Sequence, residues 1–131
     1  GEMLTAIRVP KISAKGTSAF VKLGARRYLV ISIAMAAARL VTGADGRIEQ
    51  AAIAVGSCSA VAQRLPALEA ALVGCQADTF LGSVVAAEHL AALSPIDDVR
   101  GSRQYRMEAA REIVGRALLA AAGVPEAELA A

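Results

Sequence analysis

Two apolar runs separated by a short polar break form the most regular pattern in the chain. The first run covers residues 28–41, the second covers residues 48–55, and the segment GADG stands between them at residues 43–46. Asp-Gly between two apolar runs is typical of a β-hairpin, because glycine accepts the positive φ that a tight turn requires. We therefore predict a hairpin within residues 18–56, with the later part of the chain covering one of its faces.

The first of these runs is also compatible with a helix, since it is long enough and rich in alanine. Its bulky side chains nevertheless alternate with smaller ones. The bulky positions are Leu29, Ile31, Ile33 and Met35, and the smaller ones are Val30, Ser32, Ala34 and Ala36. A period of two favours a strand between two layers, so we predict a strand, with a helical turn as the alternative for residues 26–31.

Two shorter extended segments are expected before the hairpin. Residues 3–9 are rich in β-compatible side chains, and Pro10 ends them because proline cannot donate a hydrogen bond to a sheet. Residues 11–17 resemble a loop that turns at Gly16, and residues 19–23 form the second extended segment.

After residue 56 the apolar period becomes helical. Pro66 suits the first turn of a helix, and Gly74 suits its C-terminal end. A second helix is predicted over residues 77–93, where Ser94 and Pro95 end it. Its apolar stripe consists of Phe80, Val84, Ala87 and Ala91.

The clearest helical pattern begins after Ser102, a good N-cap residue, and ends at Gly123 and Pro125. Its apolar stripe is Met107, Ala110, Val114, Ala117 and Ala121. Its outer face carries Glu108 with Arg111 and Glu112 with Arg116, at spacings that allow ion pairs on a helix surface.

These elements predict an α+β fold, with a small antiparallel sheet of three to four strands and about three helices on one face. The 131 residues are enough for a single domain with its own core. Because β-like sequence starts at the first residue, we expect the chain to be a fragment of something longer.

Composition and charge narrow the possible functions. No run of about 18 apolar residues predicts a membrane span. The net charge is +2, but residues 1–27 carry six basic residues against Glu2. These charges are scattered and accompanied by one aromatic residue, Phe20, so we do not predict nucleic-acid binding. Cys58 and Cys75 are expected to be free, buried thiols of a cytoplasmic protein.

No group of residues predicts catalysis or metal binding. His89 lies alone in an alanine-rich segment, and Ser57, Cys58 and Ser59 have no base beside them. Asp97 and Asp98 are best explained as a turn that caps the following helix. Lys22 is the one charge worth singling out, because it sits in an apolar segment; the simpler alternative is a surface lysine with a packed aliphatic stem.

Four segments in order along the chain carry a family resemblance. GEMLTAIRVP at residues 1–10 resembles G-E-x-L-x-x-I-x-(I/L/V)-P, and AFVKLGARR at residues 19–27 resembles F-x-K-x-x-x-R-R. Residues 45–56 resemble the hairpin that follows, and PIDDVRGS with Tyr105-Arg106 resembles P-x-x-D-x-R-x-S/T…Y-R. Together they resemble the C-terminal domain of the FAD-binding subunit of the xanthine dehydrogenase/carbon monoxide dehydrogenase family of molybdenum hydroxylases.

The resemblance implies an electron-transfer role without catalysis by this chain alone. In such enzymes a molybdopterin-binding subunit hydroxylates the substrate, iron–sulfur clusters relay electrons, and the flavin subunit passes them to an acceptor. Leu4 stands where the family has a residue that contacts FAD, and Lys22 where it has a lysine near the flavin. A cation there would stabilise negative charge on the reduced ring. Arg26, Arg27 and the turn from Asp97 to Arg100 are assigned to structure or subunit docking.

One departure from the family concerns the cofactor. The glycine-rich loops that hold the FAD pyrophosphate are missing from these 131 residues. We therefore expect the chain to lack an upstream FAD-binding domain and to bind FAD weakly alone. The expected partners are that domain, the molybdopterin-binding subunit and the iron–sulfur subunit. The alternative function is a stand-alone interaction or dimerisation module without flavin.

Overall fold

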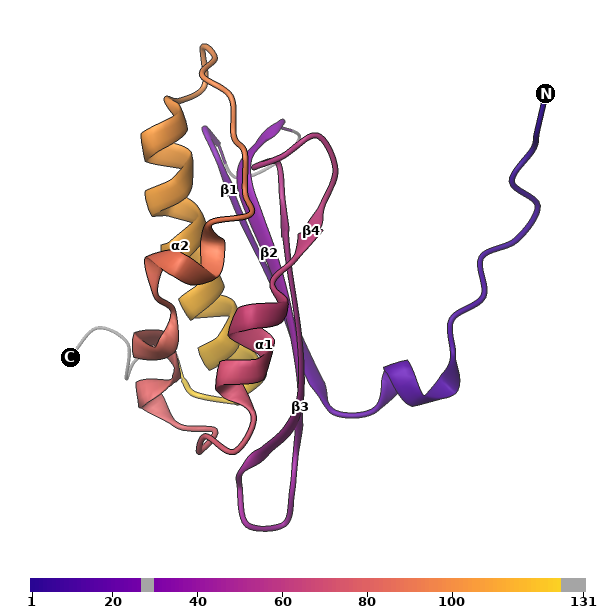
Figure 1. Cartoon of the computed structure of the whole chain (residues 1–131), viewed down its shortest axis with the longest axis vertical. Helices are drawn as coiled ribbons and strands as arrows, with labels where there is room; N and C mark the ends of the chain where they lie inside the picture. Colours follow the sequence, from indigo (N-terminus) through magenta and orange to yellow (C-terminus); the bar gives the residue numbers. More distant parts are fainter. Residues whose placement is uncertain (27–29, 126–131) are drawn as a thin grey trace.

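A four-stranded antiparallel sheet and one layer of helices make up the fold (Figure 1). The computed structural model describes residues 1–26 and 30–125. The strands lie in the order β1 (Thr17–Gly24), β2 (Ser32–Thr42), β3 (Ile48–Gly56) and β4 (Gln63–Arg64). The helices that follow β4 all pack on the same face of the sheet, which confirms the predicted fold class.

The central hairpin is formed by β2 and β3, as predicted. Met35 pairs with Gly56 at one end and Thr42 with Ile48 at the other. In the turn, Gly46 has a φ of 79°, and the Asp45 carboxylate accepts a hydrogen bond from the Arg47 N–H at 3.1 Å. The alternative of a helical turn at residues 26–31 falls largely on residues 27–29, outside the described residues.

The predicted turn at Gly16 is also present, after a 3₁₀ segment, η1 (Lys11–Ala14). Gly16 has a φ of 86°, and a Cβ there would lie 2.0 Å from the Leu40 carbonyl oxygen. Only glycine fits both constraints. The turn leads into β1, which contains the predicted extended segment at residues 19–23.

The core lies between the sheet and the helices. In β2 the alternate residues Ala34, Ala36, Ala38 and Leu40 are buried, and Ile48, Ile53 and Val55 of β3 join them. The three alanines are short, so the long C-terminal helix can lie close to the middle of the sheet.

Two α-helices match the sequence predictions. Helix α1 (Pro66–Leu72) buries Leu68 and Leu72 and is followed by Gly74 with a φ of 87°. Helix α2 (Arg103–Ala121) is capped by the Ser102 hydroxyl, which accepts from the Tyr105 N–H at 3.1 Å.

Of the two ion pairs predicted on the outer face of α2, one forms and one does not. Glu112 and Arg116 form the predicted ion pair, at 2.8 Å. The expected pairing of Glu108 with Arg111 is wrong. Glu108 instead accepts from the Gln104 side chain, and Arg111 donates to the Val85 carbonyl.

The helix predicted over residues 77–93 is two short 3₁₀ segments, η2 (Thr79–Val84) and η3 (Ala87–Leu90). The predicted stripe is wrong as well, since Phe80 is 74% exposed. The buried side chains are Leu81, Val85, Leu90 and Leu93, at uneven spacing. Glycine and two valines weaken the helix locally, and the bond from Arg111 holds the extended Val85 against α2.

The strand predicted at residues 3–9 does not form in this chain. Residues 1–10 have no regular structure, are exposed throughout, and lead away from the sheet on the side opposite the helices (Figure 1). A strand needs a neighbouring strand for its N–H and C=O groups, and these residues pair with none of the four described strands.

No helix in the described residues has the length and apolar character needed to cross a membrane.

Candidate functional site

One face of the sheet is not covered by any described element. Because side chains alternate along a strand, the residues that do not face the helices share this second face. We call it the open face. It includes Ser18, Phe20, Lys22, Met35, Ala37, Arg39, Val41, Gln50, Ala52, Ala54 and Arg64.

A shallow hollow of about 400 Å³ lies on the open face. Its floor is formed by small side chains, including Ala37, Ala52 and Ala54. Phe20, which is 61% exposed, and the two arginines Arg39 and Arg64 border it. The open face is therefore apolar in its middle and basic at its margin.

Lys22 lies on the same face, two residues after Phe20 and opposite Met35 of β2. Its ammonium donates to the Val30 carbonyl at 2.7 Å, and the side chain is exposed. An ammonium has three N–H donors, and this bond uses one of them. Lys22 can thus bind a further acceptor above the sheet.

Leu4, the other residue singled out by the family resemblance, is not brought close to Lys22. It is 79% exposed in the N-terminal segment that leads away from the sheet (Figure 1). Of the two predicted cofactor-binding residues, Lys22 therefore lies on the sheet and Leu4 lies in a segment outside it.

The two arginines at the hollow differ in their partners. Arg64 forms an ion pair with Glu69 at 2.6 Å, and this hydrogen bond raises the arginine pKa above its usual range. The same carboxylate oxygen accepts from the Ile53 N–H at 2.8 Å, which ties α1 to β3. Arg39 donates to the Lys15 carbonyl instead. Its charge has no carboxylate partner within residues 1–26 and 30–125.

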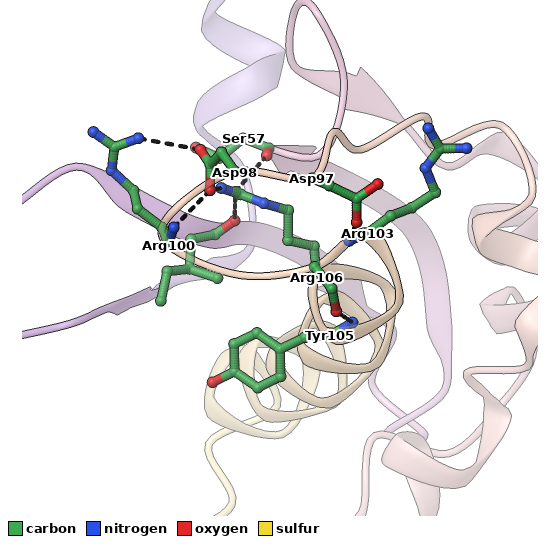
Figure 2. Close-up of polar contacts among 9 residues, drawn as sticks. Ser57, Asp97, Asp98, Arg100, Arg103, Tyr105 and Arg106 are labelled. Atoms are coloured by element: carbon green, nitrogen blue, oxygen red, sulfur yellow. Dashed lines mark hydrogen bonds and ion pairs between the residues drawn. The ribbon is translucent and has the colours of Figure 1, made fainter.

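A second polar cluster joins the start of α2 to the sheet (Figure 2). Arg106 is 3% exposed, and its guanidinium donates to Asp98 at 2.7 Å, to the Ile33 carbonyl at 2.5 Å and to the Ser57 carbonyl at 3.3 Å. Arg100 also donates to Asp98, at 3.1 Å. One side chain of α2 thus links β2, the end of β3 and the turn before the helix.

Two pKa values are shifted in this cluster, one by hydrogen bonds and one by burial. The hydrogen bond from Arg106, with further bonds from Arg100, lowers the pKa of Asp98 to about 2. Burial raises the pKa of Cys58, although the charge of Arg106 acts in the opposite direction. The Cys58 thiol is therefore protonated at neutral pH and behaves as a small buried side chain.

Several residues considered in the sequence have structural roles. Asp97 accepts from the Arg103 N–H at 2.6 Å, which agrees with the predicted capping turn. His89 accepts from the Ala86 N–H at the start of η3. Among the described residues, no three His, Cys, Asp or Glu side chains gather in a way that could hold a metal ion.

Sequence reasoning missed the role of Arg106. A signal was present, because Arg106 stands four residues before Ala110 on the buried stripe of α2. A charged residue at a buried helix position predicts a buried partner. The sequence pattern indicated only a capping turn at Asp97 and Asp98, which does not predict the pair of Asp98 with Arg106.

A larger hollow of about 850 Å³ borders α2. The charged residues along it are satisfied within the chain: Glu112 pairs with Arg116, Arg111 binds the Val85 carbonyl, and Glu108 accepts from Gln104. Each of these groups thus has a hydrogen-bond partner, but Arg111 and Glu108 have no oppositely charged partner within the described residues. The open face is taken as the candidate site because it carries Lys22, the residue singled out by the family resemblance.

Comparison with known proteins identifies the domain. The model of the CO dehydrogenase flavoprotein C-terminal domain matches residues 19–121. The chain belongs to this family. The matched part contains the whole sheet from Ala19 onward and α2, so the resemblance seen in the sequence is confirmed. A comparison with curated protein sequences gave no significant match.

Solved structures of similar fold include quinoline 2-oxidoreductase from Pseudomonas putida 86, with 30% identity and a TM-score of 0.74. The CO dehydrogenase from Hydrogenophaga pseudoflava that lacks the Mo-pyranopterin moiety has 27% identity and a TM-score of 0.69. Reconstituted CO dehydrogenase from Oligotropha carboxidovorans, with 24% identity and a TM-score of 0.73, shares the fold. The matches cover 82%, 82% and 83% of this chain but only 38%, 37% and 37% of those chains.

Proposed function

We propose that this chain is the C-terminal domain of the FAD-carrying electron-transfer subunit of a molybdenum hydroxylase, and that its open face covers the flavin. The observation that carries the proposal is the position of Lys22. It projects from an uncovered, largely apolar sheet face, beside Phe20 and the alanine-floored hollow. Family membership supports the same assignment.

The open face suits a flat aromatic ring better than it suits a phosphate group. Alanine side chains allow close approach, and Phe20 offers an apolar contact. The sequence contains no glycine-rich loop for a pyrophosphate. We infer that an upstream domain holds most of the FAD, and that Leu4 contacts the cofactor when residues 1–10 pack against that domain.

The bound flavin would accept electrons and pass them on. The chain's own residues would contribute shape and charge: the alanine floor would exclude water from the ring, Phe20 would offer it an apolar contact, and Lys22 would donate a hydrogen bond to it. A cation near the ring favours the form that carries more negative charge, so Lys22 raises the reduction potential. The molybdopterin-binding and iron–sulfur subunits are the proposed electron-donating partners.

A measurement of the flavin reduction potential tests this role of Lys22. In the intact subunit, Lys22→Ala should make the potential more negative, and Lys11→Ala should leave it unchanged, because Lys11 lies in η1 and not on the open face. An unchanged potential in Lys22→Ala would contradict the role of Lys22.

A visible absorption spectrum tests the broader assignment. The purified intact subunit should show flavin bands, while the 131-residue chain alone should retain little FAD. If the intact subunit lacks these bands after incubation with excess FAD, the flavin assignment is wrong.

The exposed apolar open face also favours one alternative, a dimerisation module that buries this face against a second copy. Sedimentation of the chain distinguishes the two functions. A stable dimer that Ala37→Glu converts to monomer, together with the absence of flavin from the intact subunit, would support the alternative.

A further inference from the structure

The strand that pairs with the Lys22 segment contains a β-bulge. Leu23 pairs with Ala34, but the next residue, Gly24, pairs with Ser32. Ile33 is therefore the extra residue of β2 and has no partner in β1. A bulge bends its strand and changes the direction in which neighbouring side chains point, and bulges are frequent beside functional sites. The bulge lies one pair from the pair formed by Lys22 and Met35.

The backbone at this bulge is held by Arg106. Its Nη1 donates to the carbonyl of Ile33 and to that of Ser57, while its Nη2 donates to Asp98 (Figure 2). Ser57 has a φ of 64°, which is uncommon for a residue other than glycine. The planar guanidinium can reach all three acceptors at once, which an ammonium cannot do in the same geometry.

The segment held by Arg106 also holds Lys22. The Lys22 ammonium donates to the carbonyl of Val30, three residues before Ile33. The position of Lys22 therefore depends on the backbone of residues 30–33. Arg106 anchors that backbone from the helical side, and Lys22 binds it from the open face.

We propose that Arg106 is a positioning residue for Lys22, acting through the Ile33 bulge. The proposal rests on the proposed function, because it gives the Arg106–Asp98 pair a task in placing a charge beside the flavin. Arg106 is buried and Asp98 is half-buried. A buried charge is seldom needed for stability alone, since apolar residues of similar volume often serve as well or better. We infer that the Arg106–Asp98 pair instead fixes the backbone at the start of β2.

The first test observes Lys22 directly in this chain. The sequence contains three lysines, so the side-chain NMR signals of Lys11, Lys15 and Lys22 can be assigned with Lys22→Ala. Arg106→Lys adds a fourth lysine signal, which is assigned by comparison with the double variant that also carries Lys22→Ala. In Arg106→Lys we expect the Lys22 signal to shift toward those of Lys11 and Lys15, which themselves stay in place. The matched control is Arg111→Lys, which changes another α2 arginine that donates to a backbone carbonyl, that of Val85. Its Lys22 signal should not move.

Amide spectra of each variant check that the fold is retained. If Arg106→Lys does not fold, Asp98→Asn replaces it, because this change removes the charge that pairs with Arg106 without changing the arginine. An unchanged Lys22 signal in a folded variant of either kind would overturn the proposal.

The second test separates this inference from the proposed function. In the intact flavoprotein, Arg106→Lys should shift the flavin potential in the same direction as Lys22→Ala. It should cause no further shift when Lys22 is already alanine, because Arg106 acts through Lys22. If Lys22→Ala shifts the potential and Arg106→Lys does not, the positioning role is wrong and the proposed function stands. If Lys22→Ala causes no shift, the proposed role of Lys22 at the flavin fails, whatever the NMR result.

Discussion

In β2, Ala37 and Ala38 are neighbours with identical side chains, yet Ala37 is exposed on the open face and Ala38 is 2% exposed under α2. The same contrast runs across the sheet. The covered face contributes Leu40, Ile53 and Val55 to the core, while the open face presents alanines, Phe20 and a margin of cations. The covered face stabilises the domain. The open face has no covering element among the described residues, and we propose above that it covers the flavin.

The strongest way to test this contrast is to place the same charge on each face. Ala38→Glu puts a carboxylate into the core without a partner and should lower the free energy of unfolding by more than about 4 kcal/mol. Ala37→Glu should change it by no more than about 0.5 kcal/mol. Urea unfolding followed by circular dichroism measures both. If both variants lost a similar amount of unfolding free energy, Ala37 would have to be buried, and the contrast between the two faces would be wrong.

The next largest effect concerns the cluster that attaches the covering layer to the sheet. Asp98 has its pKa lowered from 3.8 to about 2, mainly by the hydrogen bond from Arg106. A carboxyl with a lowered pKa stabilises the fold above its unfolded pKa, and this stabilisation is lost as the pH falls toward the folded pKa. The chain should therefore lose stability between about pH 4 and pH 2.

Asp98→Asn provides the matching measurement. At neutral pH the variant should unfold at lower urea concentration than the unchanged chain, and the difference should narrow as the pH falls through this window. A difference that stays constant from neutral pH to about pH 2 would contradict the role assigned to the Arg106–Asp98 pair.

A smaller effect is expected where the covering helix begins. Ser102→Ala removes the hydroxyl that caps α2 and should lower the free energy of unfolding by about 1 kcal/mol. Ser18→Ala makes the same chemical change on the open face, where it should cost much less. Equal effects in urea unfolding would argue against the cap.

The smallest effect should come from the solvent side of the same helix. Glu112→Gln removes the ion pair with Arg116 and should lower the free energy of unfolding by about 0.2–0.5 kcal/mol. The loss should nearly vanish at about 1 M salt, because exposed charges are then screened. A loss that persists at high salt would indicate a packing role for Glu112.

The open face itself could be predicted only in part. A charge in an apolar segment is unusual, which is why the sequence points to Lys22. The family resemblance adds that a lysine at this position lies near the flavin. The alternation of bulky and small residues around Ala34 and Ala36 indicated a strand between layers. It did not indicate that helices would cover only one face of the sheet (Figure 1). Which face is covered depends on where α2 packs, and that is a long-range contact.

The features that sequence patterns predicted correctly are local ones. Asp45 and Gly46 specify the hairpin turn, Ser102 and Pro66 mark helix starts, and Gly74 marks a helix end, because each acts on backbone groups a few residues away. These predictions needed no knowledge of the rest of the fold.

Other features of the fold depend on residues that are distant along the chain. Residues 3–9 have strand-like composition but find no strand to pair with, and Val85 is held extended by Arg111, 26 residues away, where a helix was expected. Arg106 binds Ile33, 73 residues earlier in the chain. Hydrogen bonds between segments so far apart leave no periodic trace in the sequence, because their energy depends on how the layers pack.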